Sequence, residues 1–123
     1  MTVPRSYPFM ALHFKTSTPN KLLKAFKKAI DEKRIVTWAY DGDGDFTHTT
    51  EQWKNQAWLR PKVKKDEELI LTIIKPQDKN ISSVIYAIYH GRFLEAMLTH
   101  CDLLFTRASA TALPSTGDVV GDE

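Results

Sequence analysis

The segment 69–74, with the sequence LILTII, constrains the fold more than any other part of the chain. It is short, almost continuously apolar and rich in β-branched residues, which is typical of a strand inside a sheet. Such near-continuous apolar character indicates that both faces of the strand are covered. We therefore expect a sheet with 69–74 as a central strand and the other segments arranged around it.

Strand-like composition recurs along the rest of the chain. Apolar, β-branched and aromatic residues are concentrated in segments 11–15, 35–40, 58–63 and 103–108, and segment 46–50 shows a weaker alternation. Within 58–63, the alternation predicts that Trp58, Arg60 and Lys62 share one face. Pro61 cannot donate a ladder hydrogen bond, which favours an edge or a bulge at this point.

Two segments have the periodicity of helices. Segment 19–33 follows a threonine and begins with a proline, and both residue types are favourable at a helix start. Its apolar residues recur at helical spacing, and lysines occupy the opposite face. Segment 81–99 is apolar on more than one face, with Asn80 or Ser82 as its expected cap.

The order of these segments predicts one α+β domain. It reads β-α-β-β-β-(β)-α-β, in which the strand at 46–50 is weak. We expect a single-layer, mostly antiparallel sheet with two helices packed on one face, a variant of the split-βαβ (ferredoxin-like) plan. The domain is expected to span 11–108, between a loose N-terminal extension at 1–10 and a flexible acidic tail at 109–123.

Composition limits the class of protein. A chain of 123 residues with 42% hydrophobic and 26% charged residues is ordinary for one soluble domain. Its net charge of +2 is too small to imply nucleic-acid binding by itself. Cys101 is the only cysteine, which excludes an intramolecular disulfide and favours a cytoplasmic location. With no apolar run of about 18 residues and no secretory signal, no membrane association is expected.

The acidic run at 41–45 suggests both a metal site and a turn. Asp41, Asp43 and Asp45 alternate as in a calcium loop, whose hard cation needs several oxygen ligands. The twelfth position of such a loop holds Gln52 instead of glutamate, and Asp-Gly pairs favour a hairpin for backbone reasons. We therefore expect a hairpin turn, with neither a metal nor a cofactor.

Catalytic motifs are sparse. His48 lies close to the acidic run, and neighbouring carboxylates would raise its pKa or orient it for acid–base chemistry. The four histidines lack H-x-x-H or H-E-x-x-H spacing, and no G-x-S-x-G, Walker or G-x-G-x-x-G motif is present. Cys101 fits a buried structural thiol better than a nucleophile. These observations favour a protein that is not an enzyme.

The tryptophans favour binding to another protein. Trp38 is expected in the core, whereas Trp53 and Trp58 would belong to a recognition surface within 35–63. Our first hypothesis is a small cytoplasmic, non-enzymatic protein-binding domain of adaptor or regulatory type that self-associates as a homodimer. Its candidate binding residues are Trp53, Trp58, Arg60, Lys62, Asp41, Asp43, Asp45 and His48. Self-association is expected on a helical arc that one sheet does not fully cover, formed by Tyr86, Tyr89, Phe93 and Met97.

Two alternatives use overlapping residues. Basic side chains interleaved with tryptophan indicate a nucleic-acid-binding module, with lysines on phosphates and indoles stacked on bases. A metal-dependent enzyme would instead require the hairpin 41–48, together with Glu51, to converge on a metal ion or a substrate. The residues expected for the nucleic-acid module are Lys21, Lys24, Lys28, Arg60, Lys62 and the nearby indoles.

Overall fold

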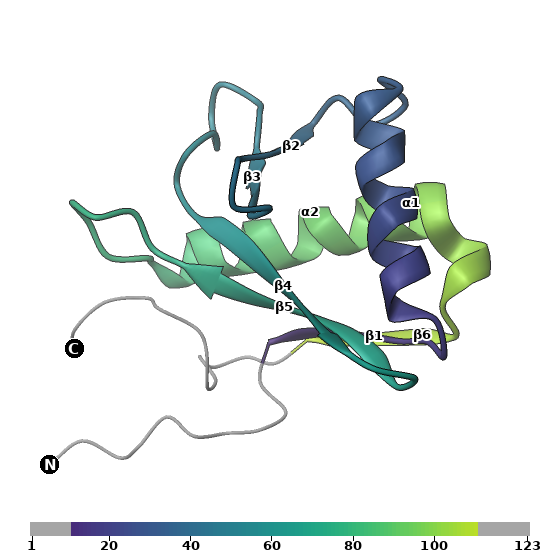
Figure 1. The fold of residues 1–123 in the computed structure, drawn as a ribbon. Helices are drawn as coiled ribbons and strands as arrows, with labels where there is room; N and C mark the ends of the chain where they lie inside the picture. The colour runs from purple at the N-terminus through teal and green to yellow at the C-terminus, as the bar shows by residue number, and fades with distance from the viewer. Residues whose placement is uncertain (1–10, 111–123) are drawn as a thin grey trace, which may run out of the picture.

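The computed structural model describes residues 11–110, which form one sheet and two long helices (Figure 1). The predicted α+β class is confirmed: an open antiparallel sheet of six strands has two helices packed on it. The weak strand near 46–50 is present, although shorter than predicted. The elements are β1 (Leu12–Lys15), α1 (Pro19–Asp31), β2 (Trp38–Tyr40), β3 (Phe46–His48), β4 (Trp58–Lys64), β5 (Glu68–Ile74), α2 (Ser83–Cys101), the 3₁₀ turn η1 (Asp102–Leu104) and β6 (Arg107–Ala110).

The sheet has the strand order β2-β3-β4-β5-β1-β6, and every neighbouring pair is antiparallel. The central position predicted for 69–74 is confirmed, because β5 lies between β4 and β1. β5 turns Leu69, Leu71 and Ile73 into the core. β4 and β5 pair along their full lengths, so these two strands form the most extensively paired part of the sheet.

The join between β3 and β4 is narrow. β3 pairs with β2 along its whole length, but it pairs with β4 only where Phe46 lies opposite Leu59. Pro61 lies beyond this pair, where β4 has β5 alone as a strand neighbour. The missing N–H of proline is tolerated there for the reason expected from the sequence, because that stretch of β4 is locally an edge.

α1 packs its apolar stripe on the sheet and exposes its lysines. Leu22, Phe26 and Ala29 are fully buried. The helix ends at a turn in which Lys33 adopts a left-handed φ of 62° and donates its N–H to the carbonyl of Ile30. This left-handed ending closes orphan carbonyls of the last turn and sends the chain into the segment that borders the site described below.

α2 begins after Ser82, whose hydroxyl accepts a hydrogen bond from the Ile85 N–H at 3.2 Å. The arc predicted for self-association is wrong, because it belongs to the core. These side chains are at most 7% exposed, so they are not available as a contact surface. The buried residues of this arc are Tyr86, Tyr89, Phe93 and Met97. The exposed side of α2 carries other apolar residues, including Val84 and Leu98.

Phe93 of α2 lies at the centre of the core. Its ring centroid is 4.6 Å from that of Phe26 on α1, 5.1 Å from Trp38, 5.4 Å from Phe46 and 6.1 Å from Phe14. Both helices and three strands meet in this aromatic cluster, whose tilted and edge-to-face pairs add to burial of apolar area. Trp38 is thereby buried in the core, as predicted.

The last strand lies later than predicted. α2 runs to Cys101 and continues as η1, so the chain turns where a strand at 103–108 was expected, and Leu103 is almost fully exposed. β6 then pairs with β1 along its length. Local composition predicted a strand here but placed it too early in the sequence. The 3₁₀ turn after α2 delays the point at which the chain returns to the sheet.

The predicted N-terminal extension at 1–10 lies outside the described residues, as does all but the start of the predicted tail at 109–123. Ser109 and Ala110, the start of that tail, belong to β6. In the stretch 11–110, neither helix has the length and apolarity needed to cross a membrane.

Candidate functional site

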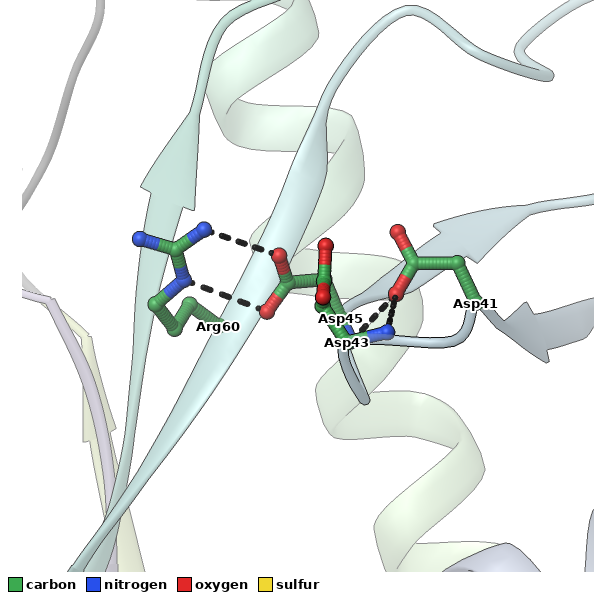
Figure 2. Close-up of polar contacts among 4 residues, drawn as sticks. All are labelled: Asp41, Asp43, Asp45 and Arg60. Atoms are coloured by element: carbon green, nitrogen blue, oxygen red, sulfur yellow. Dashed lines mark hydrogen bonds and ion pairs between the residues drawn. The ribbon is translucent and has the colours of Figure 1, made fainter.

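The acidic run forms the turn of the β2–β3 hairpin, as predicted (Figure 2). One oxygen of the Asp41 carboxylate accepts hydrogen bonds from the backbone N–H groups of Asp43 and Asp45, at 2.9 and 3.0 Å. Gly44 has a φ of 83°, and its N–H bonds the Asp41 carbonyl at 2.9 Å. Asp41 therefore serves as an internal acceptor and Gly44 supplies the left-handed angle that the turn requires.

Asp45 connects this hairpin to β4. Its carboxylate receives two hydrogen bonds from Arg60, from Nε at 3.2 Å and from Nη2 at 3.0 Å (Figure 2). The Asp45 side chain is only 8% exposed, whereas that of Arg60 is 56% exposed. A fork-to-carboxylate pair of this kind fixes relative orientation as well as adding attraction. It reinforces the join between β3 and β4 where backbone pairing is shortest.

The ligand set required by the metal-enzyme alternative is not assembled. Residues 11–110 contain no group of three or more His, Cys, Asp or Glu side chains placed to hold a metal ion. Asp41 and Asp45 are engaged in the turn and in the ion pair. His48 instead lies beside Trp38, with ring centroids 5.0 Å apart. The acidic side chains and His48 therefore do not converge on one point.

His48 is held as a neutral ring. Its Nδ1 accepts a hydrogen bond from the Thr50 N–H at 3.3 Å and lies 2.8 Å from the Thr50 hydroxyl. Since Nδ1 is an acceptor, the ring proton resides on Nε2. Burial lowers the pKa of His48, the charge of Arg92 lowers it further, and Glu95 opposes these two effects. The predicted rise in this pKa is wrong, because the ring is buried and the charges acting on it belong to α2.

A cleft of about 490 Å³ opens beside His48, and we term it the His48 cleft. Three segments enclose it: the stretch after α1, the stretch from His48 to Trp53, and the second half of α2. Trp53 is half-buried in its wall. Val36 is 68% exposed at the same site, which is unusual for a β-branched aliphatic side chain. The cleft thus joins apolar surface to a buried imidazole.

Arginine supplies the positive charge of the cleft, and no lysine lines it within the described chain. Arg34 donates to Glu32 at 2.9 and 3.1 Å, and Arg92 lies 3.5 Å from Glu95. Both ion pairs are exposed, and pairs of this kind contribute little to stability. Each guanidinium carries five N–H donors, so both have donors left for a ligand.

Tyr89 braces the loop that carries Trp53. Its hydroxyl donates to the Trp53 carbonyl at 2.6 Å and accepts from the Gln56 N–H at 3.2 Å. The same oxygen lies 3.2 Å from the hydroxyl of Thr47 on β3. One side chain of α2 thereby fixes a loop without regular structure and holds the wall of the His48 cleft in place.

A second exposed region lies on the sheet. Trp58, Arg60 and Lys62 share one face of β4, as predicted, while Leu59 between them is buried in the core. Arg60 and Lys62 are exposed and Trp58 is half-buried. The lysines of α1 face away from the same core, on its other side. The basic residues grouped in the nucleic-acid alternative therefore do not form one surface.

The eight candidate binding residues occupy three places. Asp41, Asp43 and Asp45 build or border the hairpin turn, His48 and Trp53 line the cleft, and the other three lie on β4. Sequence reasoning did not find Arg34, Arg92 or Glu95. A signal was present for two of them, because Arg92 and Glu95 are the only Asp, Glu, Lys or Arg residues in α2.

No protein-family model, no curated protein and no solved structure matches this chain.

Proposed function

We propose that this chain is a small cytoplasmic protein-binding domain without catalytic activity, which recognises a segment of a partner protein at the His48 cleft. The composition of the cleft carries the proposal. Tryptophan and arginine dominate the energetically important positions of protein interfaces, whereas lysine is depleted in their cores. The cleft contains Trp53, Arg34 and Arg92 and, among described residues, no lysine.

The arrangement of these groups suits a short peptide segment. Val36 and the face of Trp53 offer apolar surface for one side chain of the partner. Arg34 and Arg92 belong to different walls and offer N–H donors to backbone carbonyls or carboxylates. Burying an apolar side chain between such donors gives both affinity and orientation.

Two observations support a binding role over catalysis. Among the described residues, the ring of His48 hydrogen-bonds only Thr50, so no third group orients this imidazole as a base. Cys101 is buried, and burial raises the pKa of its thiol, which disfavours the reactive thiolate. Covalent catalysis requires a reactive nucleophile next to a base that a third group holds in the correct orientation.

A selection from a random displayed-peptide library tests the proposal. Peptides enriched on the wild-type domain should share a motif, and Val36→Asp should abolish their binding by placing a charge in the apolar part of the cleft. Leu103→Asp is the matched control, since Leu103 is also an exposed aliphatic residue but lies outside the cleft. Failure to enrich any motif, or equal loss of binding in both variants, would contradict the proposal.

We also propose that self-association uses the exposed side of α2 instead of its buried arc. Val84, Gly91 and Leu98 are spaced by seven residues and therefore lie along one side of the helix. Val84 is 58% and Leu98 51% exposed. A methyl group added at Gly91 would meet no atom within 4 Å, so this glycine leaves room for a second helix.

For the fold, we propose a split-βαβ (ferredoxin-like) variant with both helices on one face. The strand order β4-β5-β1-β6 supports this proposal, because α2 connects β5 to β6 around β1. The contacts of Phe93 with Phe26, and of both rings with Phe46, support placing the two helices over the same face. In this plan the β2–β3 hairpin is an insertion that extends the sheet beyond β4.

A further inference from the structure

The face of the sheet that carries Lys62 has a defined two-row pattern. In one row, Lys64, Glu68, Lys15 and Arg107 lie opposite one another across β4, β5, β1 and β6. In the adjacent row, Lys62, Ile70, His13 and Ser109 follow the same order. Cross-strand neighbours are about 5 Å apart, and successive rows on one face about 7 Å apart. Three of the four strands, β4, β1 and β6, thus present lysine or arginine on this face, and we term this surface the basic sheet face.

Most of the positive charge on this face is uncompensated. Lys15, Lys62 and Arg107 have no ion-pair partner among the described residues. Glu68 lies in the same row, opposite Lys64 and Lys15, and is hydrogen-bonded to His13 at 3.0 Å, whereas Glu67 lies 3.2 Å from Lys64. An anion placed here would neutralise free cations without first displacing a carboxylate from them.

A hollow marks where an anionic group would sit. It has a volume of about 290 Å³, and its lining combines Lys15, Lys64 and Arg107, from three different strands, with the carboxylates Glu67 and Glu68. The hollow is part of the basic sheet face and is formed by residues other than those of the His48 cleft. The two surfaces also differ in composition, because this one is rich in lysine.

β4 adds an aromatic side chain to the same face. Trp58 lies in line with Arg60, Lys62 and Lys64 at every second position of the strand. It is half-buried, opposite Ile74 of β5, so its ring is supported from the sheet side while part of it stays accessible. A supported indole next to a row of cations combines the two elements with which proteins bind single-stranded nucleic acid: a stacking platform and a charged track.

We propose that the basic sheet face binds single-stranded nucleic acid, with phosphates on Lys62, Lys15 and Arg107 and a base stacked on Trp58. This activity is separate from peptide recognition at the His48 cleft. A strand laid across an open sheet keeps its bases accessible to the indole, whereas a duplex stacks them inside. The lysines of α1 take no part, because they lie on the far side of the core.

Fluorescence anisotropy with labelled single-stranded DNA and RNA of mixed sequence, over a series of salt concentrations, tests this proposal. Lys62→Glu and Arg107→Glu should each weaken binding about tenfold at low salt, and each should reduce the salt slope by about 0.7. Lys24→Glu makes the same charge change on α1 and should alter binding less than about twofold. Trp58→Leu should weaken binding at least about fivefold and leave the salt slope unchanged.

Thermal melting of each variant separates lost binding from lost folding. Absence of salt-sensitive binding by the wild-type domain would overturn the proposal, as would equal effects of Lys24→Glu and Lys62→Glu. A duplex or heparin that competes as well as a single strand, with no effect of Trp58→Leu, would also overturn it, because the face would then bind polyanions in general. Peptide binding at the His48 cleft should be unaffected by all four substitutions.

Discussion

Gly42 and Gly44 lie two residues apart in one turn, yet only Gly44 has a left-handed backbone, with a φ of 83°. Gly44→Ala should lower the free energy of unfolding by roughly 1–2 kcal/mol, because a Cβ crowds the backbone in this conformation. Gly42→Ala should change it little, since a Cβ there meets no atom within 4 Å. Urea denaturation measures both, and equal losses would show that the turn does not depend on this angle.

His48 links stability to pH. A lowered pKa means that the folded protein binds a proton at this ring less readily than the unfolded chain does. The stability associated with the neutral ring is therefore present above the ordinary pKa of 6.5 and is lost as the pH falls below it. Between about pH 8 and pH 5, the wild-type domain should lose more stability than His48→Gln.

Urea denaturation across this pH range gives the comparison, and His100→Gln controls for removing a histidine from the same cleft. If His48→Gln and the wild type lose stability in parallel, the ring is not buried as a neutral group. The local sequence around His48 is acidic and predicted the opposite shift. Its true neighbours, Arg92 and Glu95, are far away in the chain and become neighbours only through packing of α2.

Individual elements were largely predictable, because their signals are local. Asp-Gly pairs place the β2–β3 turn, alternation places the outward row of β4, and continuous apolarity makes β5 central. For α2, local sequence signals do not determine which side of the helix is buried. Two arcs of that helix are apolar in the sequence, and only the fit of Phe93 into the aromatic core decides which arc is buried.

The proposed self-association on the exposed side of α2 can be tested by substitution. Leu98→Glu should abolish self-association, because it places a charge within the proposed helix contact. Leu103→Glu is the control, since Leu103 is 93% exposed just beyond the helix. Sedimentation velocity over a concentration series measures the association. A wild-type domain that stays monomeric throughout, or an equal response of both variants, would contradict a dimer on this helix face.

For the whole molecule, separation along the chain is a poor guide to separation in space. Trp53 and Trp58 are close in sequence and suggested one recognition surface. The chain turns between them, and the alternation of β4 then directs Trp58 to the basic sheet face while Trp53 stays in the wall of the cleft. Neither surface could be assembled from the sequence alone, because each takes residues from at least three segments that meet only after folding.

The single residue pair between β3 and β4 has a consequence for local unfolding. Few backbone hydrogen bonds need to break for the β2–β3 hairpin to detach, whereas β5 is paired on both sides. Amides of β2 and β3 should therefore exchange with deuterium sooner than those of β5. Arg60→Ala should speed exchange in the hairpin selectively by removing the ion pair with Asp45; uniform exchange across the sheet would refute this.

Because His48 belongs to β3, each such opening would also remove one wall of the cleft. The basic sheet face is built mainly on the strands that stay paired and would persist through the same event. The two proposed binding surfaces would then differ in lifetime: one transient and renewed with every closure of the hairpin, the other permanent as long as the domain is folded.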